Sequence, residues 1–269
     1  MMCKVLEFSK YSGCGNDFIL VDNRHSHFPS EIPFIQKICA RCTGVGADGV
    51  ILLEESTVAE VKMTIFNADG SEAEMCGNGV RCFLKFLIQL GFPKKTTHIE
   101  TKERVIEGGF IDDELSVNMG TPTDIQWNLD IEGQCIHFLN TGVPHAVHFV
   151  DDLKSIDVET TGRHIRRHNQ FAPKGTNVTF VQVLGPKELL FCTYERGVEA
   201  ETLACGTGAA AAAYAYGILE EIAPPVTVRT KQNDIIKIYF DPKEHILMTG
   251  PADLIYKGRL CIDMNAKIV

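Results

Sequence analysis

The chain has 269 residues and a formal net charge of −9, with 26 Lys and Arg against 35 Asp and Glu. Its composition, 45% hydrophobic and 23% charged, is that of a globular protein and excludes disordered, collagen-like and coiled-coil classes. An acidic chain lacks the excess of Lys and Arg that contacts phosphate backbones or anionic lipid, so we expect no nucleic-acid or membrane partner. The length fits two domains or one large one, and a small-molecule ligand is the expected partner.

The cysteines and the start of the chain indicate a cellular compartment. The first residues, MMCKVLEFSK, contain no apolar core behind a basic end, which predicts a cytoplasmic location. The longest uncharged stretch, 202–219, consists mostly of Ala, Gly and Thr and predicts a buried helix. The ten cysteines are then expected to be reduced thiols that bind a metal, react or pack in the core.

Taken in chain order, the apolar pattern predicts a β-rich α+β fold. Four helices are expected, at 30–41, from Val80 to Ile88, at 155–168 and at 206–221. The turn-rich stretch 119–134 places a domain boundary near 118–122. Short β-branched or alternating runs predict strands at 17–22, 49–53, 61–66, 97–101, 115–119, 145–150, 177–183, 189–194, 226–230, 235–240 and 245–249.

The second and fourth of these helices begin alike. One opens with Cys76-Gly77-Asn78-Gly79 and the other with Cys205-Gly206-Thr207-Gly208. A Gly-Asn element also leads a strand in each half, at Gly15-Asn16 and at Gly175-Thr176-Asn177. The echo favours two similar halves, each with one buried helix headed by a cysteine, although glycine-rich helix starts are common enough to leave duplication open.

The position of the two cysteines suggests chemistry. A helix N-terminus presents free N–H groups and positive charge, which can lower a thiol pKa and bind an anion. Two such sites facing each other across a cleft could remove a Cα proton with one thiolate and deliver a proton from the opposite thiol, which is racemisation without a cofactor. The alternative is that each cysteine is an inert core residue.

Other motifs give weaker signals. The segment 44–49, GVGADG, precedes a strand rather than a helix, which is the reverse of a dinucleotide site. Cys39 and Cys42 form a single C-x-x-C pair without further ligands, so no metal site is predicted. His164 and His168 have ligand spacing, but neighbouring arginines would repel a cation.

Six segments in order resemble one known family. They are SGCGNDFILVDNR (12–24), GVGADG (44–49), IFNADGSEAEMCGNGVRC (65–82), GVPHAV (142–147), GTNVTFV (175–181) and ERGVEAETLACGTGAAAA (195–212). Together they are similar to diaminopimelate epimerase, a cofactor-independent enzyme of lysine and peptidoglycan synthesis. The resemblance implies two pseudo-symmetric halves, each a sheet wrapped around a central helix: residues 1–118 with the tail 258–269 returning, and residues 119–257. It implies a small amino acid as substrate, and we expect a homodimer.

The resemblance also implies roles for individual residues. Cys76 and Cys205 match the acid/base pair, and His145 and Glu195 match residues near the thiols, although the sequence does not say which thiol each serves. His145 could instead be a packed strand residue, and Glu195 could simply pair with Arg196. The matches to substrate-binding positions are Asn16, Asn67, Gly77, Asn78, Asn177, Glu195, Arg196, Gly206 and Thr207.

Three departures from the family pattern concern the pocket. Val143 stands where Asn is common, Gly49 stands where Gln often follows Asp, and the segment from Arg196 to Cys205 is one residue longer. They leave the thiols untouched but predict a broadened amino-acid substrate range. Two alternative functions are a proline or hydroxyproline epimerase, although that class usually has His where this chain has Asn78, and a thiol-rich metal-binding protein.

Overall fold

The computed structural model describes residues 4–73, 76–202, 205–241 and 245–262. The chain divides into two compact units, one of Met1–Val117 with Pro251–Val269 and the other of Asn118–Gly250. The C-terminal return therefore begins at Pro251, earlier than the expected residue 258, because the last strand pairs with the first one from Asp253 onward. Tail residues 263–269 lie outside the described residues.

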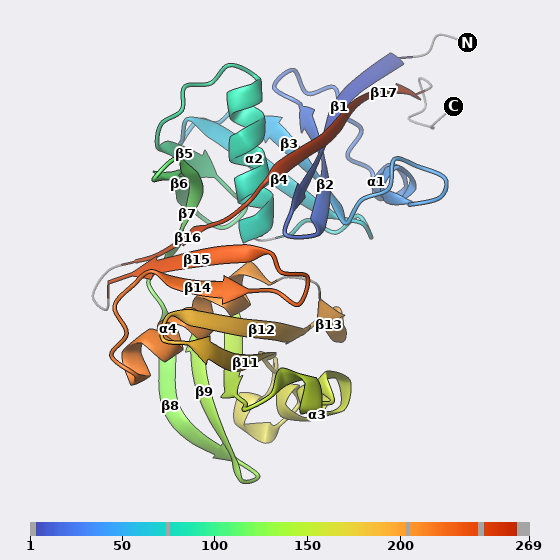
Figure 1. The fold of residues 1–269 in the computed structure, drawn as a ribbon. Coiled ribbons are helices and arrows are strands. Elements are labelled where there is room, and N and C mark those ends of the chain that lie inside the picture. Colours follow the sequence, from blue (N-terminus) through green and yellow to red (C-terminus); the bar gives the residue numbers. More distant parts are fainter. Residues whose placement is uncertain (1–3, 74–75, 203–204, 242–244, 263–269) are drawn as a thin grey trace. The chain divides into compact units, whose positions relative to one another are not determined.

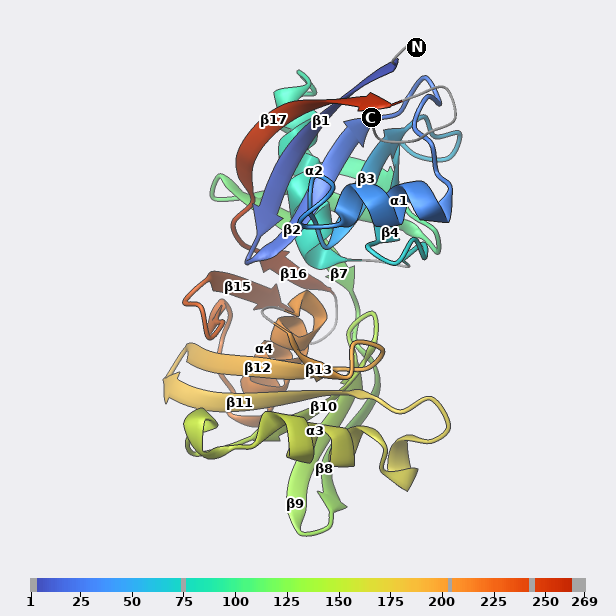
Figure 2. The same ribbon diagram turned by 90° about the vertical axis from the view of Figure 1, so that its right-hand side faces the viewer.

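The first unit contains a run of eight hydrogen-bonded strands among its described residues. Neighbours are antiparallel except β2 with β3 and β4 with β5, which are parallel. The C-terminal strand is the first of the run and lies along the N-terminal strand (Figure 2). In spatial order the strands are β17 (Asp253–Ile262), β1 (Lys4–Gly13), β2 (Asn16–Asp22), β3 (Gly49–Glu54), β4 (Val61–Asn67), β5 (Thr97–Glu100), β6 (Val105–Ile111) and β7 (Glu114–Gly120).

The second unit repeats this pattern. Its strands are antiparallel except at the same two places, β10 with β11 and β12 with β14. A short strand, β13 (Ala200–Thr202), also pairs with β12. In order the strands are β8 (Thr123–Ile131), β9 (Gln134–Asn140), β10 (Pro144–Phe149), β11 (Asn177–Gly185), β12 (Glu188–Glu195), β14 (Val226–Arg229), β15 (Ile235–Phe240) and β16 (Ile246–Thr249). The two pseudo-symmetric halves and the α+β class are confirmed.

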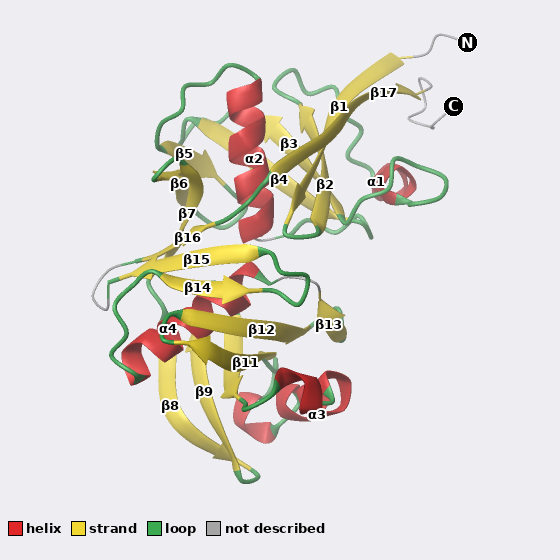
Figure 3. Cartoon of the chain, in the orientation of Figure 1, coloured by secondary structure: helices red, strands yellow, loops and turns green. Residues whose placement is uncertain are grey.

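Each parallel pair is joined through a helix, as parallel pairing requires a crossover (Figures 1 and 3). The central helices are α2 (Gly77–Gln89) and α4 (Gly206–Leu219), and each contacts several strands of its own unit. In α4 the residues Ala209–Ala213 are fully buried, so the sheet surrounds a helix that is apolar on every side. The outer helices are α1 (Ile32–Cys39), which packs on β3, and α3 (Val158–Arg166), which packs on β11 and β12.

All four predicted helices and all eleven predicted strands are present, with shifts of a few residues at their ends. The sequence patterns did not predict six further strands, β1, β6, β8, β9, β13 and β17. The turn-rich stretch 119–134 is largely β8, whose exposed residues break the alternation and whose pairing is interrupted by register shifts. Asp124 and Asn128 in this strand have positive φ angles of 56°, so its turn residues are used inside an irregular strand. In the described residues no helix is long and apolar enough to cross a membrane.

Candidate functional site

Cys76 is the N-cap of α2 in the first unit. Its backbone is extended, and its sulfur accepts a hydrogen bond from the Gly79 N–H at 3.4 Å. The thiol in turn donates to Oδ1 of Asn16, the first residue of β2, at 3.5 Å. The thiol of this half-buried residue therefore lies between a helix N–H group and a side-chain carbonyl.

An ionic network that the sequence analysis did not identify lies beside Asn16. The Asn16 amide donates to Asp48 at 2.8 Å, and Arg41 contacts Asp48 at 2.6 Å and Asp17 at 2.9 Å. Lys10, only 5% exposed, pairs with Asp17 at 2.7 Å. Burial opposes ionisation of Asp17, but hydrogen bonds from Arg41 and Lys10 outweigh it and lower its pKa to about 2. The motifs SGCGNDF and GVGADG carried this signal, because each supplies one aspartate.

Asn67 and Asn78, which the resemblance matches to substrate-binding positions, make different hydrogen bonds within this unit. Asn67, at the exposed end of β4, donates to Ser71 at 3.0 Å. The buried Asn78 side chain accepts from Arg81 at 2.8 Å, and the fully buried guanidinium also donates to the Cys14 sulfur at 3.3 Å. The buried Asn78 side chain thus stabilises the first turn of α2 through Arg81.

Cys205 is the N-cap of α4 in the second unit and is only 8% exposed. Its sulfur lies 3.3 Å from Thr207 Oγ1. Burial raises the pKa of this thiol well above its usual value, and the nearby Glu195 charge raises it further, against the opposing hydrogen bonds of Thr207 and the Gly208 N–H. The expected lowering by the helix N-terminus is wrong at Cys205, because desolvation outweighs it.

The Thr207 hydroxyl connects His145 to Cys205. Its Nε2 is 2.9 Å from Thr207 Oγ1, and its Nδ1 is 2.9 Å from Thr179 Oγ1. The Asn177 amide nitrogen, which can only donate, lies 3.5 Å from Nε2, so Nε2 is the acceptor and Nδ1 carries the proton. Complete burial and, to a smaller extent, the Arg196 charge lower the His145 pKa to about 3. His145 is therefore a neutral acceptor for Thr207.

Glu195, the last residue of β12, lies beside the Cys205 thiol. Thr202 Oγ1 donates to its carboxylate at 2.6 Å. Burial raises its pKa, and hydrogen bonds with Thr202 and Cys205 oppose the shift. The sequence did not indicate which thiol His145 and Glu195 each serve. In the structure both lie near Cys205: Glu195 contacts its thiol directly, and His145 is connected to it through Thr207.

Asn177 and Arg196 are held together. The Arg196 backbone N–H donates to Asn177 Oδ1 at 2.8 Å, and its guanidinium donates to the Gly175 carbonyl at 3.3 Å. The main chain of α4 fits tightly here, since a Cβ on Gly208 would lie 2.7 Å from Thr193 Oγ1. Glycine at this position therefore lets the start of α4 approach the sheet.

Of the three departures from the family pattern, the structure explains the one at Gly49. A Cβ on Gly49 would lie 2.5 Å from the Phe66 carbonyl, so only glycine fits this buried strand position. Val143 is half-buried in a turn in which its carbonyl accepts from the Thr141 N–H at 3.2 Å. The longer segment before Cys205 includes residues 203 and 204, which lie outside the described residues.

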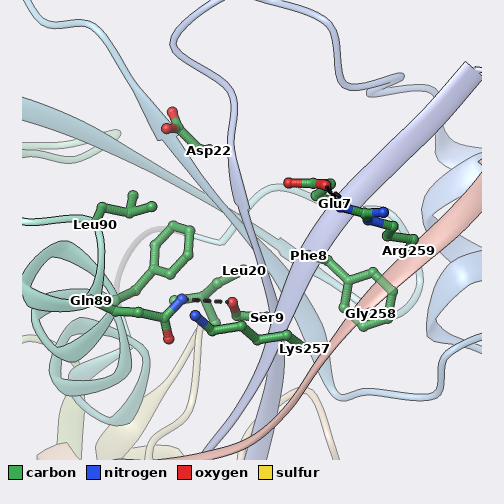
Figure 4. A pocket seen from close by; sticks show the side chains of 11 residues that line it. Glu7, Phe8, Ser9, Leu20, Asp22, Gln89, Leu90, Lys257, Gly258 and Arg259 are labelled. Carbon is green, nitrogen blue, oxygen red and sulfur yellow. Dashed lines mark hydrogen bonds and ion pairs between the residues drawn. The ribbon is translucent and has the colours of Figure 1, made fainter.

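A pocket of about 630 Å³ in the first unit lies away from Cys76 (Figure 4). Its wall includes Gln89 at the C-terminal end of α2, whereas Cys76 caps the opposite end. Gln89 donates to Ser9 at 3.1 Å in its wall, and Arg259 pairs with Glu7 at 2.8 Å. In the described part of the chain no group of three or more His, Cys, Asp or Glu side chains could hold a metal ion.

Comparisons with known proteins agree on one family. The family model described as diaminopimelate epimerase matches residues 8–125 and 137–255. The diaminopimelate epimerase of Hydrogenobaculum sp. (strain Y04AAS1) is 41% identical over 95% of this chain and 99% of its own length. That of Aquifex aeolicus is 40% identical over 95% of this chain and 98% of its own length.

Solved structures show the same fold at low identity. A phenazine biosynthesis protein of the PhzF family from Bacillus anthracis has a TM-score of 0.72 at 17% identity, covering 96% of this chain and 100% of its own. A hydroxyproline epimerase from Agrobacterium vitis has a TM-score of 0.70 at 14% identity, covering 96% of this chain and 93% of its own. Both likenesses concern the fold.

Proposed function

Because this chain belongs to the diaminopimelate epimerase family, we propose that it interconverts LL- and meso-diaminopimelate without a cofactor. One observation carries the proposal: two units with the same strand pattern each present a cysteine at the N-cap of the central helix, followed by Gly-x-Gly. Such a pair supplies two thiols and two sets of helix N–H groups, which is what inversion at an α-carbon of an amino acid requires.

In the proposed reaction one thiolate removes the Cα proton and the other thiol gives a proton to the opposite face. The thiols exchange these roles in the reverse direction. The first-turn N–H groups of Gly77, Asn78, Gly206 and Thr207 would hold the α-carboxylate, where the helix dipole also stabilises the negative charge that develops. Asn16, Asn67 and Asn177 would hold the remaining polar groups, and the Arg196 guanidinium suits the distal carboxylate.

Glu195 and His145 would divide the management of the Cys205 proton. Glu195 is a carboxylate with a raised pKa that hydrogen-bonds the thiol, so it suits the role of proton acceptor when Cys205 must become a thiolate. His145, with its pKa lowered to about 3, is a poor base and serves instead to orient the Thr207 hydroxyl. The pKa values favour this division over a direct proton transfer to the imidazole.

The decisive measurement is deuterium exchange at Cα. Purified protein in D₂O, with no added cofactor, should incorporate deuterium into LL- and meso-diaminopimelate and interconvert them. Trans-4-hydroxy-L-proline, offered under the same conditions, tests the rival epimerase function, and metal analysis tests the metal-binding alternative. Exchange on hydroxyproline but not on diaminopimelate, or turnover that disappears with a removed metal, would contradict the proposal.

A second test addresses the approach of the two thiols. If both act on one α-carbon, a mild oxidant should join Cys76 to Cys205 and abolish activity, and dithiothreitol should restore it. A variant with the exposed Cys135 replaced by Ala is the matched control and should behave like wild type. Persistent activity after complete oxidation of both thiols would refute the scheme.

We further propose that the enzyme works in the cytoplasm, as a homodimer, in lysine and peptidoglycan precursor synthesis. The apolar side chains of Leu254, Ile255 and Tyr256 on β17 are 41%, 56% and 43% exposed, and self-association would cover part of this apolar surface. Light scattering measures the assembly, and cell fractionation measures the location. A monomer at micromolar concentration would contradict the dimer.

A broadened substrate range is the last part of the proposal. Valine at 143 offers no side-chain hydrogen bond, and a pocket without such a demand rejects substrates less strongly. Amino acids with a shorter acidic side chain, such as glutamate, would then be racemised slowly while Arg196 attracts the distal carboxylate.

A further inference from the structure

One carboxylate of the network in the first unit is connected to the Cys76 thiol through a single side chain. Asp48, immediately before β3, accepts from the Asn16 side-chain amide at 2.8 Å and from the Asp17 backbone N–H at 3.1 Å. The Asn16 carbonyl oxygen accepts the Cys76 thiol hydrogen at 3.5 Å. Asn16 therefore bridges a carboxylate and a thiol with the two ends of its amide group.

The chemistry of the carboxylate decides which end of the amide faces which partner. An ionised carboxylate only accepts hydrogen bonds, so the Asn16 NH₂ group must face Asp48. The carbonyl oxygen then faces Cys76, where it can accept from a thiol but cannot donate to a thiolate. The reversed amide would place N–H groups against the sulfur and stabilise its charged form. The orientation of Asn16 thus selects between the protonation states of Cys76.

Asp48 is itself held in place on both sides. Arg41 donates to its other oxygen at 2.6 Å, and the Asp48 backbone N–H donates to the Asp17 carboxylate at 3.0 Å. Asp17 also pairs with Lys10, so two cations balance two carboxylates in this cluster. Because Asp48 and Asp17 each accept the other's backbone N–H, a rotation of Asp48 away from Asn16 would break several bonds at once.

We propose that Asp48 is a positioning residue that turns the Asn16 amide oxygen toward Cys76 and thereby keeps Cys76 in its thiol form in the substrate-free protein. Two further groups that bear on this sulfur are on α2. The Gly79 N–H favours the thiolate, and Cys82, adjacent to Arg81, is buried with a raised pKa and stays neutral. The inference rests on the proposed function only in giving the Cys76 proton a role in turnover.

The test measures thiol reactivity rather than turnover, so its outcome is independent of the proposed reaction. The rate of Cys76 alkylation by iodoacetamide is followed against pH by mass spectrometry of the Cys76 peptide, because only the thiolate reacts. In Asp48→Ala the amide is free to reverse, and alkylation at pH 7 should become about tenfold faster, with the midpoint of its pH profile at lower pH. An unchanged or slower profile in folded Asp48→Ala protein would overturn the proposal.

Two controls distinguish an effect of the Asn16 amide orientation from an effect of the Asp48 charge alone. Arg41→Gln removes a cation from the same cluster but leaves the Asp48–Asn16 bond, and it should change the alkylation rate less than about twofold. In an Asn16→Ala background, adding Asp48→Ala should have no further effect, since the bridge is already absent. If the Asp48→Ala effect persists without Asn16, Asp48 acts through space by its charge and the proposal is wrong.

A measurement on the wild-type protein covers the case in which Asp48→Ala does not fold. Neutron diffraction from crystals of the deuterated protein should place the two deuterons of the Asn16 side-chain amide toward Asp48 and its Oδ1 toward the Cys76 sulfur. Amide deuterons that point at the sulfur would show that the amide faces the other way and would overturn the proposal.

Discussion

The two cysteine-headed helices share a backbone arrangement but differ in the surroundings of their sulfur atoms. Cys76 is half-buried beside a charge-balanced network of Lys10, Asp17, Arg41 and Asp48 that reaches it through Asn16. Cys205 is almost fully buried, and the uncharged Thr207 hydroxyl connects it to a neutral imidazole, with the Glu195 carboxylate nearby. A repeated fold therefore supplies two equivalent positions, and each half sets the protonation of its own thiol by different means.

The largest expected effect tests the equivalence of the two thiols. Cys76→Ala and Cys205→Ala should each reduce epimerisation at least about 10³-fold, because each removes one of two required proton carriers. Cys82→Ala and Cys39→Ala, which truncate buried thiols away from the N-caps, should retain turnover and lose only stability. Steady-state assays with both stereoisomers decide the matter. Near wild-type turnover by Cys205→Ala would refute the two-base scheme.

The neutral imidazole gives the second unit a characteristic pH dependence. The His145 pKa is lowered to about 3 in the folded state, whereas an unfolded His has a pKa near 6.5. The unfolded state therefore binds more protons below pH 6.5, and the stability that His145 contributes is complete above that pH and is lost as the pH falls towards 3. We expect a decrease of roughly 2–3 kcal/mol in unfolding free energy from pH 7 to 4.5.

Urea unfolding of wild type and His145→Gln across this pH range isolates the effect. The variant should be less stable at pH 7 but should lack the steep loss towards acid. Parallel pH dependences in the two proteins would mean that His145 is charged or exposed in solution.

Glu195 tests how Cys205 loses its proton. Glu195→Gln keeps the shape but cannot accept a proton, so kcat/KM should fall by roughly 10²-fold. Because burial raises the Glu195 pKa, wild-type activity should decline as the pH falls through that raised value, and the variant should lack this acidic limb. Glu199→Gln, which removes a carboxylate paired with Arg166, is the matched control. An unchanged pH profile in Glu195→Gln would assign the proton to another group.

The exposures of the two sulfur atoms can be compared directly. Cys76 is half-buried, whereas Cys205 is 8% exposed with a raised pKa, so iodoacetamide at pH 7.5 should modify Cys76 at least about tenfold faster. Peptide mass spectrometry after short labelling times measures both rates in one sample. Faster labelling of Cys205 would reverse the comparison between the two sites.

The smallest expected effect concerns Val143 in the turn before β10. Val143→Asn supplies a hydrogen-bonding side chain and should raise the preference for diaminopimelate over glutamate by roughly threefold to tenfold. Cα deuterium exchange on each amino acid gives the ratio. The absence of exchange on glutamate in wild type, together with an unchanged preference in the variant, would show that Val143 only packs.

The amino-acid sequence is sufficient to predict the repeated helix starts, the four helices, most of the strands and the residues at the N-caps. These features depend on local patterns: glycine after an N-cap cysteine, apolar residues at helical or alternating spacing, and turn residues between them. The same patterns do not predict β8. Its side chains are mostly exposed and two of its residues have positive φ angles, as in a loop, and it forms a strand by pairing with β9.

The chemistry around each sulfur atom depends on contacts between segments that are distant in the sequence. The sequence did not reveal that Thr207 connects Cys205 to His145, because those partners lie 62 positions apart and meet only when β10 packs on α4. Similarly, the network from Lys10 to Asp48 forms where the starts of β2 and β3 align. Burial also reversed the pKa expected for Cys205. A helix N-cap is a local property, whereas desolvation depends on every segment that covers the site.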